Sequence, residues 1–253
     1  MKRLVLSVLL VLGTLLPLSA ATRTDVNVLE ATESIRFLSQ EITKNYLYLY
    51  ANPLKKREVG KEIRRGLEEL VKNIRTISIS TNDEDTRNVL EFLIYSKDQI
   101  EDLVKEKPDK EKAALMLDYS ETLLEGANSI ARTHNYEFTE SEKMLMKGKR
   151  IEYLLERSAK YYMALGVGLG TEINRRQMER AIEMLEENLR DIEAYDYPPE
   201  MKKAQQRLQI SWNVTKSLFE RREKMFVSNL MVLSGTEMES ITRQFVLYHR
   251  KAQ

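Results

Sequence analysis

The sequence predicts an all-α protein made of two tandem antiparallel four-helix bundles. Charged residues make up 31% of the chain, and its 253 residues include only 9 Gly and 5 Pro. Leu, Glu, Lys, Arg and Ala dominate at helical spacing, which is the composition of long amphipathic helices. Related strings also recur about 115 residues apart, which indicates an internal duplication.

The N-terminal segment 1–21 is typical of a cleavable signal peptide. Lys2 and Arg3 precede an apolar run over 4–16, and small residues end the segment at Ala20 and Ala21. The run is shorter than the roughly 20 residues that a membrane-spanning helix needs. The chain has no cysteine, so neither a lipoprotein anchor nor a disulfide is expected. We therefore expect a periplasmic protein that begins at residue 22.

The first predicted unit, 22–136, contains four helices separated by proline and capping residues. The breaks predict helices over 25–51 and 54–80, a third helix capped by Asn82 and Asp83, and a fourth between Pro108 and His134.

The second predicted unit, 137–253, also contains four helices. Thr139 and Glu142 have the spacing of a capping box, which opens a helix that continues to about Leu165. The glycine-rich turn over 166–170 closes it, and a sixth helix continues to about Ala194. A Pro-Pro corner at 198–199 starts a seventh helix, and an eighth reaches the C-terminus. The sequence leaves open whether these last two are continuous.

The duplication rests on two pairs of matching strings. In the first pair, Leu38, Lys44 and Tyr46 match Leu154, Lys160 and Tyr162. In the second pair, Leu70 and the string 73–77 match Leu185 and the string 188–192. Because both matches occur in order and in the same register to within a residue, we interpret the chain as two homologous bundles.

The string 35–40, Ile-Arg-Phe-Leu-Ser-Gln, with Lys44 and Tyr46 after it, resembles a known sensor family. It is similar to the N-terminal domain of type IV pilus methyl-accepting chemotaxis transducers, a sensory domain related to the periplasmic domain of nitrate/nitrite sensor kinases. Their typical string is Arg-Met-Leu-Ser-Gln-Arg, with a lysine and an aromatic residue further on. Glu41 departs from the second arginine. In the second copy, Glu152 replaces Arg36, Leu155 and Glu156 replace Ser39 and Gln40, and Arg157 keeps the second arginine.

The resemblance implies an antiparallel four-helix bundle that senses a small anion such as nitrate or nitrite. In the nitrate sensors, the arginine matching Arg36 comes from two subunits and holds the anion between them. The implied ligand-binding residues are Arg36, Ser39, Gln40 and Lys44. Because the second copy has Glu152 at the arginine position, a two-arginine site requires a homodimer that pairs first copies. A membrane receptor or histidine kinase is the implied partner.

The residues themselves also leave purely structural roles open. A guanidinium can hold a planar oxyanion with two parallel hydrogen bonds, but an arginine on a Glu-rich helix is often a salt-bridged surface residue. Lys44 could contact a ligand, or its aliphatic stem could cover the seam between the helices of the bundle. Three tyrosines could line a pocket for an organic ligand, or they could pack partly in the core and partly at an interface: Tyr46, Tyr48 and Tyr50. Trp212 is expected in the core.

Several classes of function are not expected. The net charge is +1, and −1 once Lys2 and Arg3 are removed, which gives no basic footprint for nucleic acid. The glycine run 166–170 follows a helix and not a strand, so no cofactor is expected. The only histidines, His134 and His249, lie outside a Glu-x-x-His pair, and no nucleophile motif is present, so neither a metal site nor an enzyme is expected.

Two hypotheses for the function remain. In the first, the protein is a ligand-binding sensor module that signals through a membrane partner. In the second, it binds no small molecule and is a helical interaction scaffold in the envelope, associated with pilus or chemoreceptor machinery. The eroded motif of the second copy and Glu41 in the first favour the scaffold. The resemblance around Arg36 favours the sensor.

Overall fold

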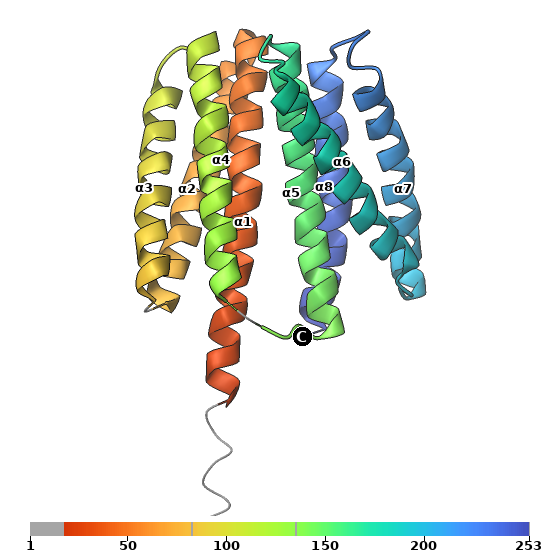
Figure 1. Ribbon diagram of the computed structural model, residues 1–253. Helices are drawn as coiled ribbons and strands as arrows, with labels where there is room; N and C mark the ends of the chain where they lie inside the picture. Colours follow the sequence, from red (N-terminus) through yellow and green to blue (C-terminus); the bar gives the residue numbers. More distant parts are fainter. Residues whose placement is uncertain (1–17, 82, 135, 253) are drawn as a thin grey trace, which may run out of the picture.

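The computed structural model describes residues 18–81, 83–134 and 136–252, with side chains from Asp25 onward. All regular structure in these residues is helical, which confirms the all-α prediction (Figure 1). The helices are α1 (Leu18–Ala51), η1 (Pro53–Lys55), α2 (Lys56–Ser80), α3 (Glu84–Lys105), α4 (Lys110–Thr133), α5 (Glu140–Gly166), α6 (Glu172–Ala194), α7 (Pro199–Glu220) and α8 (Ser228–Lys251).

The expected signal peptide lies largely outside the described residues, because the description begins at Leu18. Helix α1 therefore starts inside the segment that the sequence assigns to the signal peptide, upstream of the expected break after Ala21. Within the part of the chain that is described, every helix is too short or too polar to span a bilayer.

Capping side chains fix several helix starts at the predicted positions. The Asp83 carboxylate accepts a hydrogen bond from the Thr86 backbone N–H at 2.7 Å. The capping box of α5 is confirmed: Thr139 accepts from the Glu142 N–H at 3.3 Å, and the Glu142 carboxylate accepts from the Thr139 N–H at 2.8 Å. These bonds satisfy N–H groups that have no partner inside the helix.

The seventh and eighth helices are separate, because the chain turns between α7 and α8. The hydroxyl of Tyr162 accepts a hydrogen bond from the Val227 N–H at 2.9 Å, which holds this turn against α5. The ring of Phe226 lies where a side chain on Gly166 would be, so the glycine permits the close approach. Gly168, with φ of +80°, adopts the left-handed conformation that ends α5.

Helices α1 and α5 run parallel through the middle of the molecule and contact each other (Figure 1). On one side, α1 packs against α2 and α4, and α3 packs against both of these. On the other side, α5 packs against α6 and α8, and α7 packs against both. Because α1 and α5 each contact three other helices, both are buried all round, over 38–49 and 154–164.

Candidate functional site

The interior between α1 and α5 contains charged and polar side chains that amphipathic helices normally expose. The buried polar residues of the two central runs are Ser39, Gln40, Glu41, Thr43, Lys44, Asn45, Glu156, Arg157, Ser158 and Lys160. Charged residues are rarely buried unless they are paired, so each needs a partner in this interface. The partners fall into two groups, on opposite sides of the α1–α5 contact.

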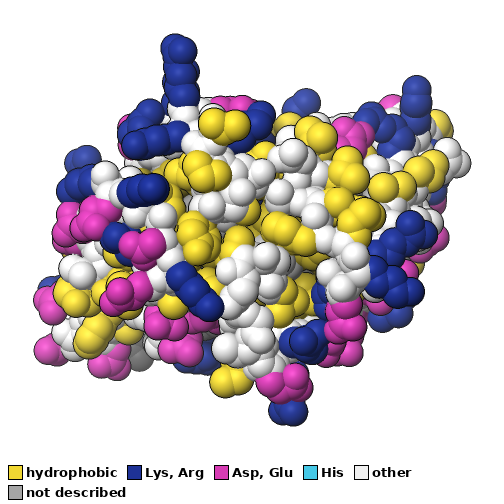
Figure 2. All heavy atoms as spheres, turned by 90° about the horizontal axis from the view of Figure 1, so that it is seen from above, with side chains coloured by type: hydrophobic (Ala, Val, Ile, Leu, Met, Phe, Trp, Pro, Cys, Tyr) yellow, Lys and Arg dark blue, Asp and Glu magenta, His cyan; other side chains and the backbone are white. Residues whose placement is uncertain are grey.

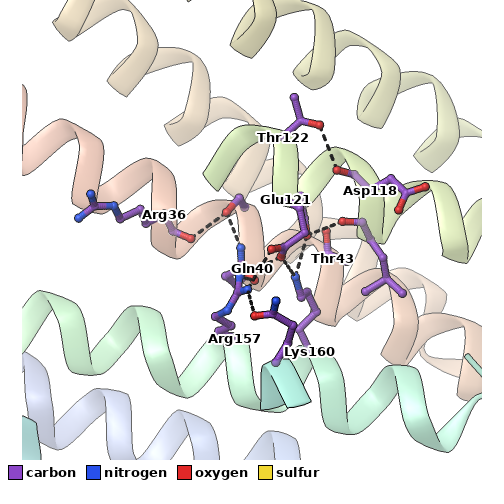
Figure 3. Close-up of polar contacts among 12 residues, drawn as sticks. Arg36, Gln40, Thr43, Asp118, Glu121, Thr122, Arg157 and Lys160 are labelled. Carbon is purple, nitrogen blue, oxygen red and sulfur yellow. Dashed lines mark hydrogen bonds and ion pairs between the residues drawn. The ribbon is translucent and has the colours of Figure 1, made fainter. Parts of the chain in front are cut away.

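The first group, which we call the α4-side network, consists of Glu121, Arg157, Lys160, Gln40 and Gln177 (Figure 3). Both terminal nitrogens of Arg157 donate to the Glu121 carboxylate at 2.9 Å, in the parallel geometry that makes Arg–carboxylate pairs strong. Lys160 Nζ lies 2.5 Å from the same carboxylate. Burial alone would raise the pKa of Glu121, but the two cations outweigh it and lower the pKa to about 2.

Amide side chains complete this network. Arg157 Nη2 donates to Gln177 Oε1 at 2.9 Å, and Gln40 Nε2 donates to Ser39 Oγ at 2.8 Å. Lys160 also donates to Ser120 Oγ at 2.9 Å, while burial lowers its pKa to about 8 against the opposing effect of the Glu121 carboxylate. The charged groups on this side are thus paired with one another.

The second group lies on the α8 side of the interface. Lys44 Nζ on α1 donates to Glu156 Oε1 on α5 at 2.7 Å, and the carboxyl of Glu239 on α8 also faces Glu156. Burial raises the pKa of Glu156 well above its ordinary value, Lys44 opposes this, and the Glu239 carboxylate raises it further. Apart from the facing Glu239 carboxyl, the Oε2 atom of Glu156 has no hydrogen-bond partner in the described structure. Carboxylates are therefore incompletely neutralised on this side.

A cavity of about 210 Å³, which we call the interface cavity, lies beside this second group, between α1, α2, α5 and α8. Its charged lining residues are Glu33, Glu41, Glu69, Glu152, Arg65, Lys149 and Arg243. Four carboxylates thus face three cations. Arg65 pairs with Glu41 at 3.0 Å, and Arg243 Nε lies 3.4 Å from Glu152 Oε1.

Two carboxylate oxygens at this cavity are buried and accept no hydrogen bond from the described residues: Glu33 Oε2, and Glu152 Oε1, whose ion-pair partner Arg243 Nε lies 3.4 Å away. The Glu33 residue is only 7% exposed. Burial is the largest effect on the pKa of Glu152 and of Glu41 and raises both, although nearby cations oppose it. An unsatisfied buried acceptor is costly, so a donor that entered the cavity would be stabilised there.

The four residues that the family resemblance implies as a site do not converge. Arg36 Nη1 pairs with Glu33 on its own helix, and its side chain points away from the Gln40–Arg157 contact (Figure 3). Ser39 Oγ donates to the Arg36 carbonyl at 2.8 Å. Lys44 is engaged by Glu156, two helical turns beyond Arg36. Arg36 does not line the interface cavity, whereas its partner Glu33 does.

Other residues weighed in the sequence are also placed. Glu152 does not pair with Arg36 but with Arg243, because α8 lies against this face of α5. Tyr46 is buried, whereas the Tyr48 hydroxyl donates to Asn229 Oδ1 at 2.6 Å. Trp212 lies in the core, as predicted.

Sequence reasoning missed Glu33, Glu121 and Arg243 as partners in this interface. All three lie on helices rich in charged residues, where carboxylates and cations are expected on the solvent face. The one available signal was the recurrence of Lys44 as Lys160, because a lysine kept at the same place in two related strings needs a partner there. Comparison with family models, with curated proteins and with solved structures finds no match to this chain.

Proposed function

We propose that the protein is a periplasmic, sensor-like module that binds a small molecule with an ammonium group in the interface cavity. The observation that carries this proposal is a pair of buried carboxylate oxygens that accept no hydrogen bond from the described residues, Glu33 Oε2 and Glu152 Oε1, of which the second has a 3.4 Å ion pair with Arg243. An ammonium group has three donors and a positive charge, so it would satisfy both oxygens and offset the excess of carboxylates. The cavity volume of about 210 Å³ is below the roughly 300 to 1,000 Å³ of sites for drug-sized ligands, so the ligand would be a very small metabolite.

Cations at the interface are already engaged, which argues against nitrate or nitrite as the ligand there. Arg36 pairs with Glu33, Lys44 with Glu156, and Lys160 with Glu121. A free anion would have to displace a carboxylate from Lys44, from Lys160 or from the terminal nitrogen of Arg36, although Arg36 Nε has no hydrogen-bond partner in the described residues. An amino acid differs from nitrate because its ammonium group could reach Glu33 and Glu152 while its carboxylate takes the place of Glu152 beside Arg243.

The proposed architecture is two tandem antiparallel four-helix-bundle repeats, 22–136 and 137–253, that pack through α1 and α5 like the two halves of a dimer. Matching positions support it. Leu38 and Leu154 are buried, as are Lys44 and Lys160. The side chains of Asn73 and Asn188, matched in the second pair of strings, both donate to the backbone carbonyl four residues earlier, at 2.7 Å.

This packing suggests how binding would be read out. The interface cavity is lined by α1 and α2 of the first proposed repeat and by α5 and α8 of the second. A ligand held between them would favour one relative placement of the two repeats, which a membrane receptor or histidine kinase could recognise. The packing also makes a second chain unnecessary for the interface cavity, in contrast to the two-subunit site of the nitrate sensors.

Thermal unfolding of residues 22–253 tests the proposal. The panel contains glycine, alanine, putrescine and sodium nitrate, measured for the native chain and for Glu33→Gln and Glu152→Gln. A ligand at about 100 times its dissociation constant adds roughly 2.7 kcal/mol to stability, a shift that is easily measured. We expect an ammonium compound to raise the melting temperature of the native chain, and both variants to reduce this shift. The control variant Glu187→Gln, at an exposed site outside the cavity, should leave the shift intact. A shift with nitrate alone would contradict the proposal.

An interaction scaffold is the second candidate, and one surface favours it. Hydrophobic side chains gather over the middle of the end of the molecule where α1 ends (Figure 2). Exposed large apolar residues in the chain segments at this end are Leu54, Ile173, Met225, Phe226 and Leu230. Apolar patches of this kind mark protein contacts. Loss of a cross-linked envelope partner on Leu54→Ser and Ile173→Ser, with no ligand-dependent stabilisation in the panel, would favour the scaffold.

A further inference from the structure

A second cavity, of about 680 Å³, lies within the first four helices and has a different chemical character. We call it the α2–α3 cleft, because residues of these two helices form most of its lining. Its apolar floor and walls include Tyr46, Leu49, Ile63, Leu67, Val104 and Pro108. The volume is within the range of sites for small organic ligands, and apolar lining with a few polar groups is typical of them.

The polar group in the floor is the hydroxyl of Tyr46. The residue is 1% exposed, and its oxygen has no hydrogen-bond partner in the described structure. Burial raises the pKa of Tyr46 to about 12, and the nearby carboxylate of Asp109 acts in the same direction. The phenol is therefore a neutral donor, and leaving it unpaired costs free energy that a ligand oxygen would recover.

The rim of the cleft carries unpaired positive charge. Lys56 and Arg64 have no ion-pair partner among the described residues, and both are exposed. Of the carboxylates at the cleft, Glu101 lies 3.3 Å from Lys97 and Glu106 lies 3.1 Å from Lys112. The charged lining residues balance in number, three cations against three carboxylates, because Lys105 also lines the cleft and pairs with Asp102. Glu68 has no ion-pair partner among the described residues, and the local positive charge is confined to Lys56 and Arg64.

We infer that the α2–α3 cleft binds a medium-chain carboxylate that carries a second oxygen on its chain. The carboxylate would lie at Lys56 and Arg64, the chain on Leu49, Ile63 and Leu67, and the second oxygen at the Tyr46 hydroxyl. A cationic head group is disfavoured beside Lys56 and Arg64, and a purely apolar molecule would leave these two cations and the phenol unsatisfied. This site is separate from the interface cavity, so the inference does not depend on the proposed function.

Calorimetric titration of residues 22–253 with octanoate, 8-hydroxyoctanoate and octylamine tests this inference. We expect both acids to bind, the hydroxy acid about 2- to 10-fold more tightly, which corresponds to one hydrogen bond. Octylamine should not bind. In Tyr46→Phe, which keeps the ring and removes the hydroxyl, the advantage of the hydroxy acid should disappear while octanoate still binds.

A variant that fills the cleft provides the second arm. Gly60 lines the cleft, and a methyl group there would have only Arg64 within ordinary contact, at 3.7 Å, so Gly60→Leu should fold and exclude both acids. Its melting temperature reports folding directly. The double variant Lys56→Gln, Arg64→Gln should weaken both acids, whereas Lys61→Gln, an exposed α2 cation outside the cleft lining, should not.

Three results would overturn the inference: no binding of octanoate to the native chain, equal binding of octylamine, or unchanged binding in a folded Gly60→Leu variant. Equal affinity for the two acids would contradict the contact with Tyr46. Because Glu33→Gln and Glu152→Gln change the other cavity, they should leave octanoate binding intact, which separates this test from that of the proposed function.

Discussion

Lys44 on α1 and Glu156 on α5 form a buried ion pair of 2.7 Å between the two central helices. The Glu156 side chain is 1% exposed. Glu156 occupies the place in the second string that Gln40 occupies in the first, and Lys160, which matches Lys44, pairs with Glu121 on α4. Two lysines at matching positions are therefore both buried and both paired, but with partners on different helices. Pairing of this kind favours one register of the interface over others.

Replacing Lys44 with methionine should strongly destabilise the protein, because it leaves the Glu156 carboxyl buried without its cation. Breaking one partner of a buried pair costs about 3 to 5 kcal/mol. In Lys44→Met, Glu156→Leu the unpaired charge is gone, so most of this loss should be recovered. Urea unfolding of the native chain, the two single variants and the double variant gives the coupling energy. If the losses of the single variants simply add, Lys44 and Glu156 do not act as a pair.

Stability should fall as the pH rises above about 4.5, because several carboxyl groups have raised pKa values in the folded protein. Burial is the main cause for Glu156, Glu152 and Glu41. A raised carboxyl pKa means that the folded state binds more protons, so the stabilisation is complete below the unfolded pKa and is lost as the pH passes the folded pKa. Each such group contributes up to about 1.4 kcal/mol per pH unit.

The variant Glu156→Gln isolates one of these groups. It should show a smaller loss of unfolding free energy between pH 5 and pH 8 than the native chain in urea titrations. Comparison with the native chain cancels the contribution of other groups, such as His249, whose pKa burial lowers. An unchanged pH dependence would mean that Glu156 titrates normally in the folded state.

Glu121→Gln should have the opposite pH signature. Lys160 and Arg157 lower the pKa of Glu121 to about 2, so its contribution is complete above about pH 4.5 and is lost as the pH falls toward 2. Because the carboxylate is one-third exposed, we expect a loss of only about 2 kcal/mol at pH 7. The native and variant stabilities, measured by urea unfolding, should converge near pH 2. A constant difference across this range would exclude a charged Glu121 as the centre of the α4-side network.

Replacing each of two α2 glycines with alanine should change the stability of the protein in opposite directions. A methyl group on Gly66 would lie 2.8 Å from Ile42 Cγ1, so Gly66→Ala forces α1 and α2 to adjust, at about 1 to 3 kcal/mol. Gly60 has room for the methyl group, so Gly60→Ala should gain about 0.5 to 1 kcal/mol from helix propensity. Melting temperatures should thus fall for Gly66→Ala and rise for Gly60→Ala. A rise in both would contradict the close contact of α1 with α2.

Helix positions could be predicted from the sequence because their signals are local. Asp83 and Thr139 cap helices at the predicted places, since each side chain bonds a backbone N–H only three residues away. The break between α7 and α8 was left open because Val227 is held by Tyr162, which is 65 residues away. No local pattern reports such a contact.

The site was harder to predict, because its partners come together only in the folded chain. The amphipathic pattern of the sequence assigns Glu121 to the solvent face, yet its carboxylate is the common acceptor for Arg157 and Lys160. The ligand-binding prediction for Arg36 came from the family resemblance, whereas the Glu-rich helix also suggested a salt-bridged arginine, and Glu33, three residues earlier, pairs with it. The general lesson is that a helix surrounded by three neighbours, as α1 is, buries faces that an amphipathic pattern assigns to solvent.

Proton release on ligand binding tests directly whether the interface cavity takes an ammonium group. A cation beside Glu33 and Glu152 would lower the pKa of Glu152 and expel protons, whereas an anion there would draw protons in. Titration calorimetry near pH 6, in two buffers of different ionisation enthalpy, measures the number of protons released or taken up on binding. We expect proton release for the best ammonium compound of the panel, and less release with Glu152→Gln, in which only Glu41 of the two cavity carboxyls with raised pKa values remains. Proton uptake, or saturable binding of nitrate without any ammonium ligand, would contradict it.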